Sequence, residues 1–147
     1  GRYAASRGVT PVIETHGGVN AFDDGVEHYG SVTTNIEMLC EILKQVPELT
    51  VNYDPANLYA VGMKNQADFF ERIKGKVSCV HLKDFVRLPS GHLLPAACGD
   101  SDFDWKPVLA MLKDFDGPAL FEYEIPSDVA DGCKRCMEYI KLTEEKI

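Results

Sequence analysis

The sequence alternates four times between a short apolar segment with the two-residue period of a β-strand and a longer segment with the period of an α-helix. The strand-like segments are residues 10–16, 49–58, 76–84 and 118–125. A parallel strand reaches its neighbour only through a crossover connection, usually a helix, so this order predicts an α/β fold with a parallel sheet. Two glycine-rich stretches, residues 17–30 and 87–103, are predicted to be loops.

Caps and apolar stripes mark the helical segments. One begins at Thr34, which has the spacing of a capping box with Glu37. A second covers residues 66–74, and a third follows Asp104, which is placed to cap it. A last helix, capped by Ser127 or Asp128, is predicted to bury one stripe, made of Val129, Cys133, Met137 and Ile140.

Composition limits the classes of function. The 147 residues are 45% hydrophobic and 26% charged, which fits one packed domain over residues 1–147 and not a disordered chain. The net charge of −8 repels phosphate backbones, so nucleic acid is not expected as a partner. No apolar run approaches the roughly 20 residues that cross a bilayer, and no signal peptide is recognisable. We therefore expect a cytoplasmic protein with no membrane partner.

Ionisable residues stand near the end of each strand-like segment, namely Glu14, Asp54, His81 and Glu122. The carboxyl ends of parallel strands meet at one edge of the sheet, where α/β proteins build their sites. Three carboxylates and one imidazole at that edge suit a divalent cation. The oxygen ligands favour Mn²⁺, Mg²⁺ or Co²⁺, and the histidine allows Zn²⁺. Because side chains two residues apart share a strand face, His16, Lys83 and Glu124 belong to the same edge.

Each of these residues also has a plain structural interpretation. Asp54 precedes a proline and could begin an Asp-Pro turn, and His81 could be a hydrogen-bonded core histidine. Glu14 and Glu122 could be ordinary charges at strand ends. For any one residue alone this is the better interpretation. Four ionisable residues in otherwise apolar segments are costly unless paired or coordinated, and this favours the metal site.

Five stretches, in order over nearly the whole chain, resemble the last four strands of the xylose-isomerase-like TIM barrels: VIETHGG, NYDPANL, VHLKDFVRLPSG, GDSDFDW and LFEYE. That family includes ketose 3-epimerases, hydroxypyruvate isomerase and inosose dehydratase. The resemblance implies the C-terminal half of a TIM (β/α)8 barrel, strands five to eight, with the helices outside. It also implies proton transfer by Glu14 and Glu122, and a metal held by Glu14, Asp54, His81 and Glu122.

Further positions are matched to the family one at a time. An arginine six residues after the metal histidine contacts substrate in the epimerases, and Arg87 stands at that offset. Asn57 stands where ketose 3-epimerases tend to have a histidine. We expect Asn57 and Glu124 to support the ligands, and Arg87, His16 and Lys83 to bind substrate. The family is indicated more strongly than any one of its branches.

The leading hypothesis is an isomerase or epimerase that uses a divalent metal, Mn²⁺ before the others, on a small polyhydroxy substrate, a sugar or sugar phosphate. One of Glu14 and Glu122 would remove a proton to form an enediolate, and the other would return it. A dehydratase or lyase on the same scaffold is the second hypothesis, and a non-catalytic half-barrel is the third. A complete barrel takes about 250 residues. We therefore expect either a homo-oligomer or an N-terminal half that is missing from this chain.

Overall fold

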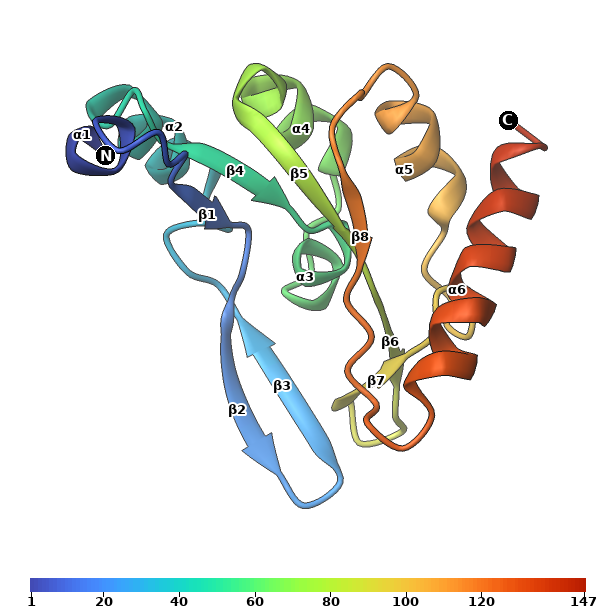
Figure 1. The fold of residues 1–147 in the computed structure, drawn as a ribbon. Coiled ribbons are helices and arrows are strands. Elements are labelled where there is room, and N and C mark those ends of the chain that lie inside the picture. Colours follow the sequence, from blue (N-terminus) through green and yellow to red (C-terminus); the bar gives the residue numbers. More distant parts are fainter.

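The computed structural model describes residues 1–147, and a parallel sheet of four strands lies at its centre. In spatial order the strands are β1 (Val12–Glu14), β4 (Thr50–Tyr53), β5 (Val77–Leu82) and β8 (Ala119–Phe121). Every neighbouring pair is parallel (Figure 1). Each strand falls within one of the four strand-like segments, so the prediction of an α/β fold with a parallel sheet is confirmed.

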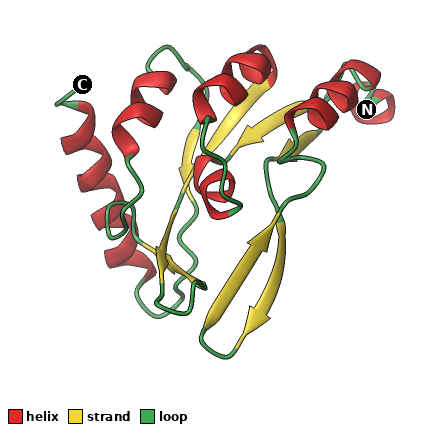
Figure 2. Cartoon of the chain, turned by 180° about the vertical axis from the view of Figure 1, so that it is seen from behind, coloured by secondary structure: helices red, strands yellow, loops and turns green.

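Helices connect the parallel strands and pack on one face of the sheet (Figure 2). The helices are α1 (Arg2–Ala5), α2 (Ile36–Gln45), α3 (Pro55–Ala60), α4 (Gln66–Ile73), α5 (Trp105–Leu112) and α6 (Val129–Glu144), with a short 3₁₀ helix, η1 (Lys74–Lys76). Val51 and Val80 of the sheet are fully buried against this layer, as are Leu39 of α2 and Phe69 of α4. The apolar core therefore lies between the sheet and the helices.

A second, antiparallel sheet corrects the two loop predictions. Its strand order is β2 (Gly18–Phe22), β3 (Gly25–Tyr29), β7 (Leu93–Ala96) and β6 (Asp84–Arg87). Residues 17–30 and 87–103 thus contain strands, because short turns close two hairpins inside the glycine-rich stretches. In the second hairpin Gly91 takes a left-handed backbone with φ of 92°, which glycine adopts without strain.

The start of α2 differs from the predicted capping box by one residue. Asn35, and not Thr34, caps the helix, since its side chain accepts hydrogen bonds from the backbone N–H groups of Glu37 and Met38. Thr34 instead exchanges hydrogen bonds with Ser31 through its hydroxyl group. The helix itself forms where it was expected.

Helix α6 is rotated relative to the predicted stripe. Val129 and Met137 are 47% and 44% exposed, and the buried positions are Gly132, Cys136, Ile140 and Thr143. The buried Gly132 faces the ring of Tyr123, and a Cβ atom there would stand 2.1 Å from that ring, so this position requires glycine. No helix of the structure, α6 included, has both the length and the apolar character for crossing a membrane.

Asp84 organises the loop that carries the GDSDFDW stretch. Its buried carboxylate accepts hydrogen bonds from the Gly99 N–H at 2.9 Å, the Ser101 hydroxyl at 2.6 Å and the Trp105 indole N–H at 3.2 Å. Burial raises the pKa of Asp84, and these donors act against that rise. Asp104 caps α5 as predicted, by accepting from the Lys106 N–H at 3.1 Å. The loop is therefore fixed at the end of the sheet where β5 and β8 finish.

Candidate metal centre

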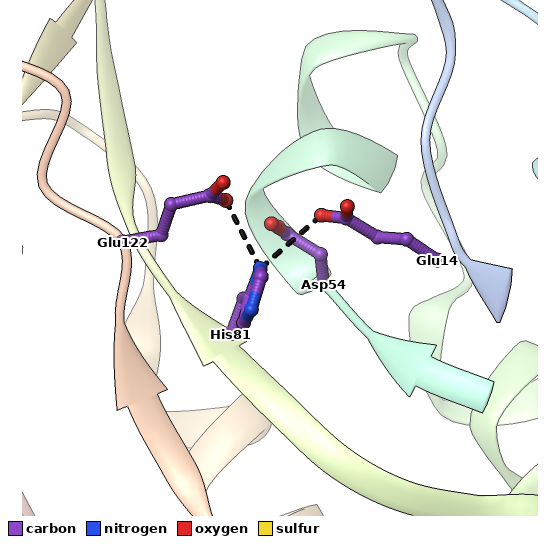
Figure 3. A group of neighbouring side chains, drawn as sticks. All are labelled: Glu14, Asp54, His81 and Glu122. Carbon is purple, nitrogen blue, oxygen red and sulfur yellow. Dashed lines mark hydrogen bonds and ion pairs between the residues drawn. The ribbon is translucent and has the colours of Figure 1, made fainter. Parts of the chain in front are cut away.

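The four candidate ligands converge. Glu14 ends β1, Asp54 follows β4, His81 lies near the end of β5, and Glu122 follows β8. One ligand atom from each lies within 4.8 Å of the others (Figure 3). Parallel strands bring residues from distant parts of the sequence to one edge, and the convergence predicted from their positions is thus present.

His81 stands between the two glutamates. Its Nδ1 atom lies 3.0 Å from Glu122 Oε2 and 3.3 Å from Glu14 Oε1, the contacts drawn as dashed lines in Figure 3. One nitrogen can donate its single proton to only one of these oxygens at a time. His81 can therefore donate to only one of the two glutamates at a time, while Asn57 donates to Glu14 and Lys83 donates to Glu122.

Asp54 supplies the deepest carboxylate and has two functions. Its Oδ1 atom accepts a hydrogen bond from the Asn57 N–H at 2.8 Å and caps α3, so the interpretation as a turn-forming Asp-Pro pair holds in part. Its Oδ2 atom is buried and accepts no hydrogen bond. Burial raises the pKa of Asp54 well above its usual range, and Lys83 opposes that rise. A buried oxygen of this kind is stabilised by a cation.

Lys83 is the nearest protein cation. Its buried ammonium group donates to Glu122 Oε2 at 2.6 Å and lies 3.4 Å from Asp54 Oδ2. Burial by itself lowers the pKa of Lys83, but Asp54 and Glu122 reverse this and raise it. Burial likewise acts to raise the pKa of Glu122, and Lys83 and His81 hold it below its ordinary value. Both groups are thus held in their charged forms.

The donor set fits a divalent cation. When all three carboxylates are ionised, as they would be on binding a cation, they exceed the single Lys83 ammonium by two negative charges, which one divalent ion would balance. The Asp54 carboxylate points into the group in Figure 3, and its Oδ2 atom has no hydrogen-bond partner. Oxygen-rich ligation with one imidazole suits Mn²⁺, Mg²⁺, Co²⁺ or Zn²⁺, and the geometry does not select among them.

Two further side chains brace the ligands. Asn57, which is fully buried, donates from Nδ2 to Glu14 Oε1 at 3.1 Å while its backbone N–H holds Asp54. Thr15, which sequence reasoning missed, accepts from the Asp54 N–H at 2.8 Å through its hydroxyl oxygen and joins β1 to the end of β4. Its only signal in the sequence is its place between Glu14 and His16, on the opposite face of the strand.

The three residues predicted to bind substrate make different contacts. Lys83 touches the ligands, whereas the His16 ring contacts the Gly17 carbonyl and faces His28 at 6.1 Å between ring centres. Arg87 is exposed and donates to the Gly91 carbonyl at 3.0 Å, with its guanidinium group over Tyr59. It contacts none of the four ligands. Glu124 is exposed and forms no hydrogen bond or ion pair with the protein.

A family model identifies the class of protein to which this fold and this cluster of candidate metal ligands belong. The model described as "Xylose isomerase-like TIM barrel" matches residues 1–142. The chain therefore belongs to the xylose isomerase-like TIM-barrel family. No curated protein matches it at a significant level.

Solved structures agree with this assignment. The probable 3-DHS dehydratase AsbF, involved in petrobactin synthesis, from Bacillus anthracis superposes with a TM-score of 0.74 at 16% identity, over 95% of this chain and 52% of its own. A xylose isomerase domain protein from Planctomyces limnophilus gives 0.72 at 22% identity, over 99% and 49%. A D-tagatose 3-epimerase-like protein gives 0.66 at 22% identity, over 99% and 52%. These identities show the fold alone, and the chain spans about half the length of each structure.

Proposed function

We propose that the chain carries the metal centre of a divalent-metal-dependent isomerase or epimerase that acts on a small sugar or sugar phosphate. The observation that carries this proposal is the convergence of Glu14, Asp54, His81 and Glu122 within 4.8 Å, with a buried Asp54 oxygen that accepts no hydrogen bond. Glu14, Asp54, His81 and Glu122 would hold the ion. When bound, the ion would polarise a substrate carbonyl and make the neighbouring C–H more acidic.

The two glutamates are placed to move the proton. Glu14 and Glu122 come from the two outer strands of the parallel sheet and approach His81 from opposite sides. A substrate carbon between them would have one carboxylate on each face, so one can take the proton and the other can return it. Lys83 holds Glu122 in its ionised form, the form that can accept a proton from substrate.

The remaining candidates would bind and orient substrate. Lys83 contacts the cluster and shares a pocket with His16, and both would hold hydroxyl or carbonyl oxygens of the polyhydroxy substrate. Arg87 lies further along β6 and would contact substrate only after leaving Gly91 and Tyr59. Asn57 and Glu124 are proposed to support the ligands, Asn57 through its contact with Glu14.

We further propose that residues 1–147 are four βα units of a TIM barrel, its strands five to eight. The outer strands β1 and β8 each have one partner in the sheet, and Val12 and Leu120 on them are 47% and 52% exposed. The chain also spans about half of each similar structure. Four further units, from a longer polypeptide or from a second copy, would pair with these edges.

A dehydratase or lyase reaction is the second candidate, and the position of Lys83 favours it. An ammonium group 2.6 Å from the carboxylate that would take a proton could give one to a departing hydroxyl group. One of the similar structures is a probable dehydratase. Loss of water lowers the mass of the substrate by one water molecule, whereas isomerisation conserves that mass.

The test of the metal centre is a calorimetric titration of the metal-free protein with Mn²⁺. The wild type is expected to bind one ion per chain. His81→Ala and Glu122→Gln should each weaken binding by more than about 100-fold, since each removes a ligand and not only its support. His92→Ala changes a partly buried histidine and Glu138→Gln an exposed glutamate, both outside the cluster, and these two variants serve as controls. Equal affinity in all five proteins would refute the site.

A further inference from the structure

A pocket of about 300 Å³ adjoins the candidate metal centre. It lies between the β2/β3 hairpin, which contributes His28, and the rim residues His16, Lys83 and Glu124. Lys83 belongs to both places, since it lines the pocket and also bonds to Glu122. We name it the His28 pocket.

His28 presents an unused hydrogen-bonding group. Its Nδ1 atom is buried and has no partner in the protein, and its ring stands edge-on to Phe85 at 4.9 Å between ring centres. Burial, followed by the nearby His16 and Lys83, lowers the pKa of His28 to about 4, so the ring is neutral at pH 7. A neutral imidazole has one donor and one acceptor, the pair that an alcohol hydroxyl group also has.

The charges in the pocket disfavour an anion. Its lining includes one ammonium group, Lys83, and one carboxylate, Glu124, with His16 and His28 as further titratable side chains. The Lys83 ammonium group already contacts Glu122 and Asp54. The Glu124 carboxylate has no partner in the protein and would therefore face a bound ligand. A phosphate here would meet the Glu124 carboxylate with no unpaired ammonium or guanidinium group beside it, whereas a hydroxyl group could donate to that carboxylate. Arg87, the other cation of β6, contacts Gly91 and Tyr59 instead.

We propose that the His28 pocket binds the uncharged, hydroxyl-bearing end of the substrate, with His28 and Glu124 as its specificity-determining residues. The apolar ring of Phe85 forms the wall against which the carbon chain packs. The protein therefore acts on a free polyhydroxy compound and discriminates against its phosphorylated form. This inference rests on the proposed function, because the metal centre would hold the reacting end of the same molecule.

The test uses two probes that differ only in a phosphate group, D-ribulose and D-ribulose 5-phosphate. Both are titrated calorimetrically into the Mn²⁺-loaded protein at one fixed Mn²⁺ concentration. The free ketose is expected to bind at least about tenfold more tightly, because the phosphate would face the Glu124 carboxylate. A separate titration with Mn²⁺ alone tests the metal centre. A failure of the proposed function can therefore be told apart from a failure of the inference about the His28 pocket.

Variants of the pocket sharpen the test. His28→Phe keeps an aromatic ring but removes both nitrogens, and should weaken D-ribulose binding roughly five- to tenfold with Mn²⁺ affinity unchanged. His28→Gln, which retains a donor and an acceptor, should recover part of that loss. Glu27→Gln, at the neighbouring exposed position of β3, is the control and should change nothing. Glu124→Lys should reverse the preference and favour the phosphorylated probe.

Three results would overturn the proposal. They are tighter binding of D-ribulose 5-phosphate by the wild type, unaltered D-ribulose binding by His28→Phe, and binding of neither probe by protein that holds Mn²⁺. Preference for the free ketose that His28→Phe weakens and Glu124→Lys reverses would support it.

Discussion

The two sheets of this molecule differ in how they are held and in what they contribute. The parallel sheet is buried against helices on one face and brings four candidate metal ligands to its edge. The antiparallel sheet extends away from that core (Figure 1), and Val19, Phe22 and Tyr29 of its first hairpin are exposed. The first sheet thus fixes the proposed reaction centre, and the second forms the wall of the pocket beside it. The proposed pocket is shared between the two sheets, since His28 lies on β3 and Glu124 follows β8.

The largest expected difference between the two regions is in stability. Trp105, at the start of α5, is fully buried, packs on Phe103 and donates to Asp84. Trp105→Ala should lower the free energy of unfolding by about 3–5 kcal/mol, because it leaves a cavity in the core and removes a hydrogen bond. Phe22→Ala in the hairpin should cost about 1 kcal/mol or less, since Phe22 is half exposed and stacks only on His92. Urea denaturation measures the free energy of unfolding of both variants, and equal losses would show that the two regions do not differ in stability.

The second expected effect concerns metal affinity. Asn57→Ala removes the hydrogen bond that holds the Glu14 carboxylate but keeps the backbone N–H that holds Asp54. Mn²⁺ affinity should fall about 10- to 100-fold, less than on loss of a ligand. Asn20→Ala in the hairpin is the matched control. Calorimetry on folded protein, checked by circular dichroism, decides the matter, and an unchanged affinity for Asn57→Ala would show that Asn57 does not support the site.

The smallest expected effect concerns the attachment of the hairpin. Asp24, at the turn between β2 and β3, lies 2.6 Å from His92 Nδ1, and this hydrogen bond lowers the pKa of Asp24. The pair therefore stabilises the hairpin above the ordinary carboxyl range and is lost as the pH falls through the lowered pKa of Asp24. Asp24→Asn should speed amide exchange in β2 and β3 at neutral pH and leave β4 and β5 unchanged. Slower exchange in the hairpin, or an equal change in both sheets, would contradict this.

The sequence predicts the parallel sheet and its edge because both depend on regular signals. Apolar segments alternate with amphipathic helices, and Glu14, Asp54, His81 and Glu122 each stand near a strand end. Parallel pairing then brings them together, as the structure shows. The convergence of these four side chains could thus be predicted without knowledge of any contact.

The remaining features depend on tertiary contacts that leave weak signals. The hairpin strands lie within glycine-rich stretches, so the position of His28 beside the site could not be foreseen. The rotation of α6 places Gly132 against the ring of Tyr123. Arg87 stands at the offset that the family resemblance suggests, yet its direction is set by Gly91 and Tyr59. Periodicity assigns an element, but it does not tell which neighbour a side chain meets.

The most direct test of the central claim is anomalous X-ray diffraction from crystals of the protein grown with Mn²⁺. One strong anomalous peak is expected between Glu14, Asp54, His81 and Glu122, with an Asp54 oxygen turned toward it. Two results would contradict the assignment of these four residues as the metal centre. One is the absence of such a peak, with Lys83 alone bridging Asp54 and Glu122. The other is a peak at another place in the chain.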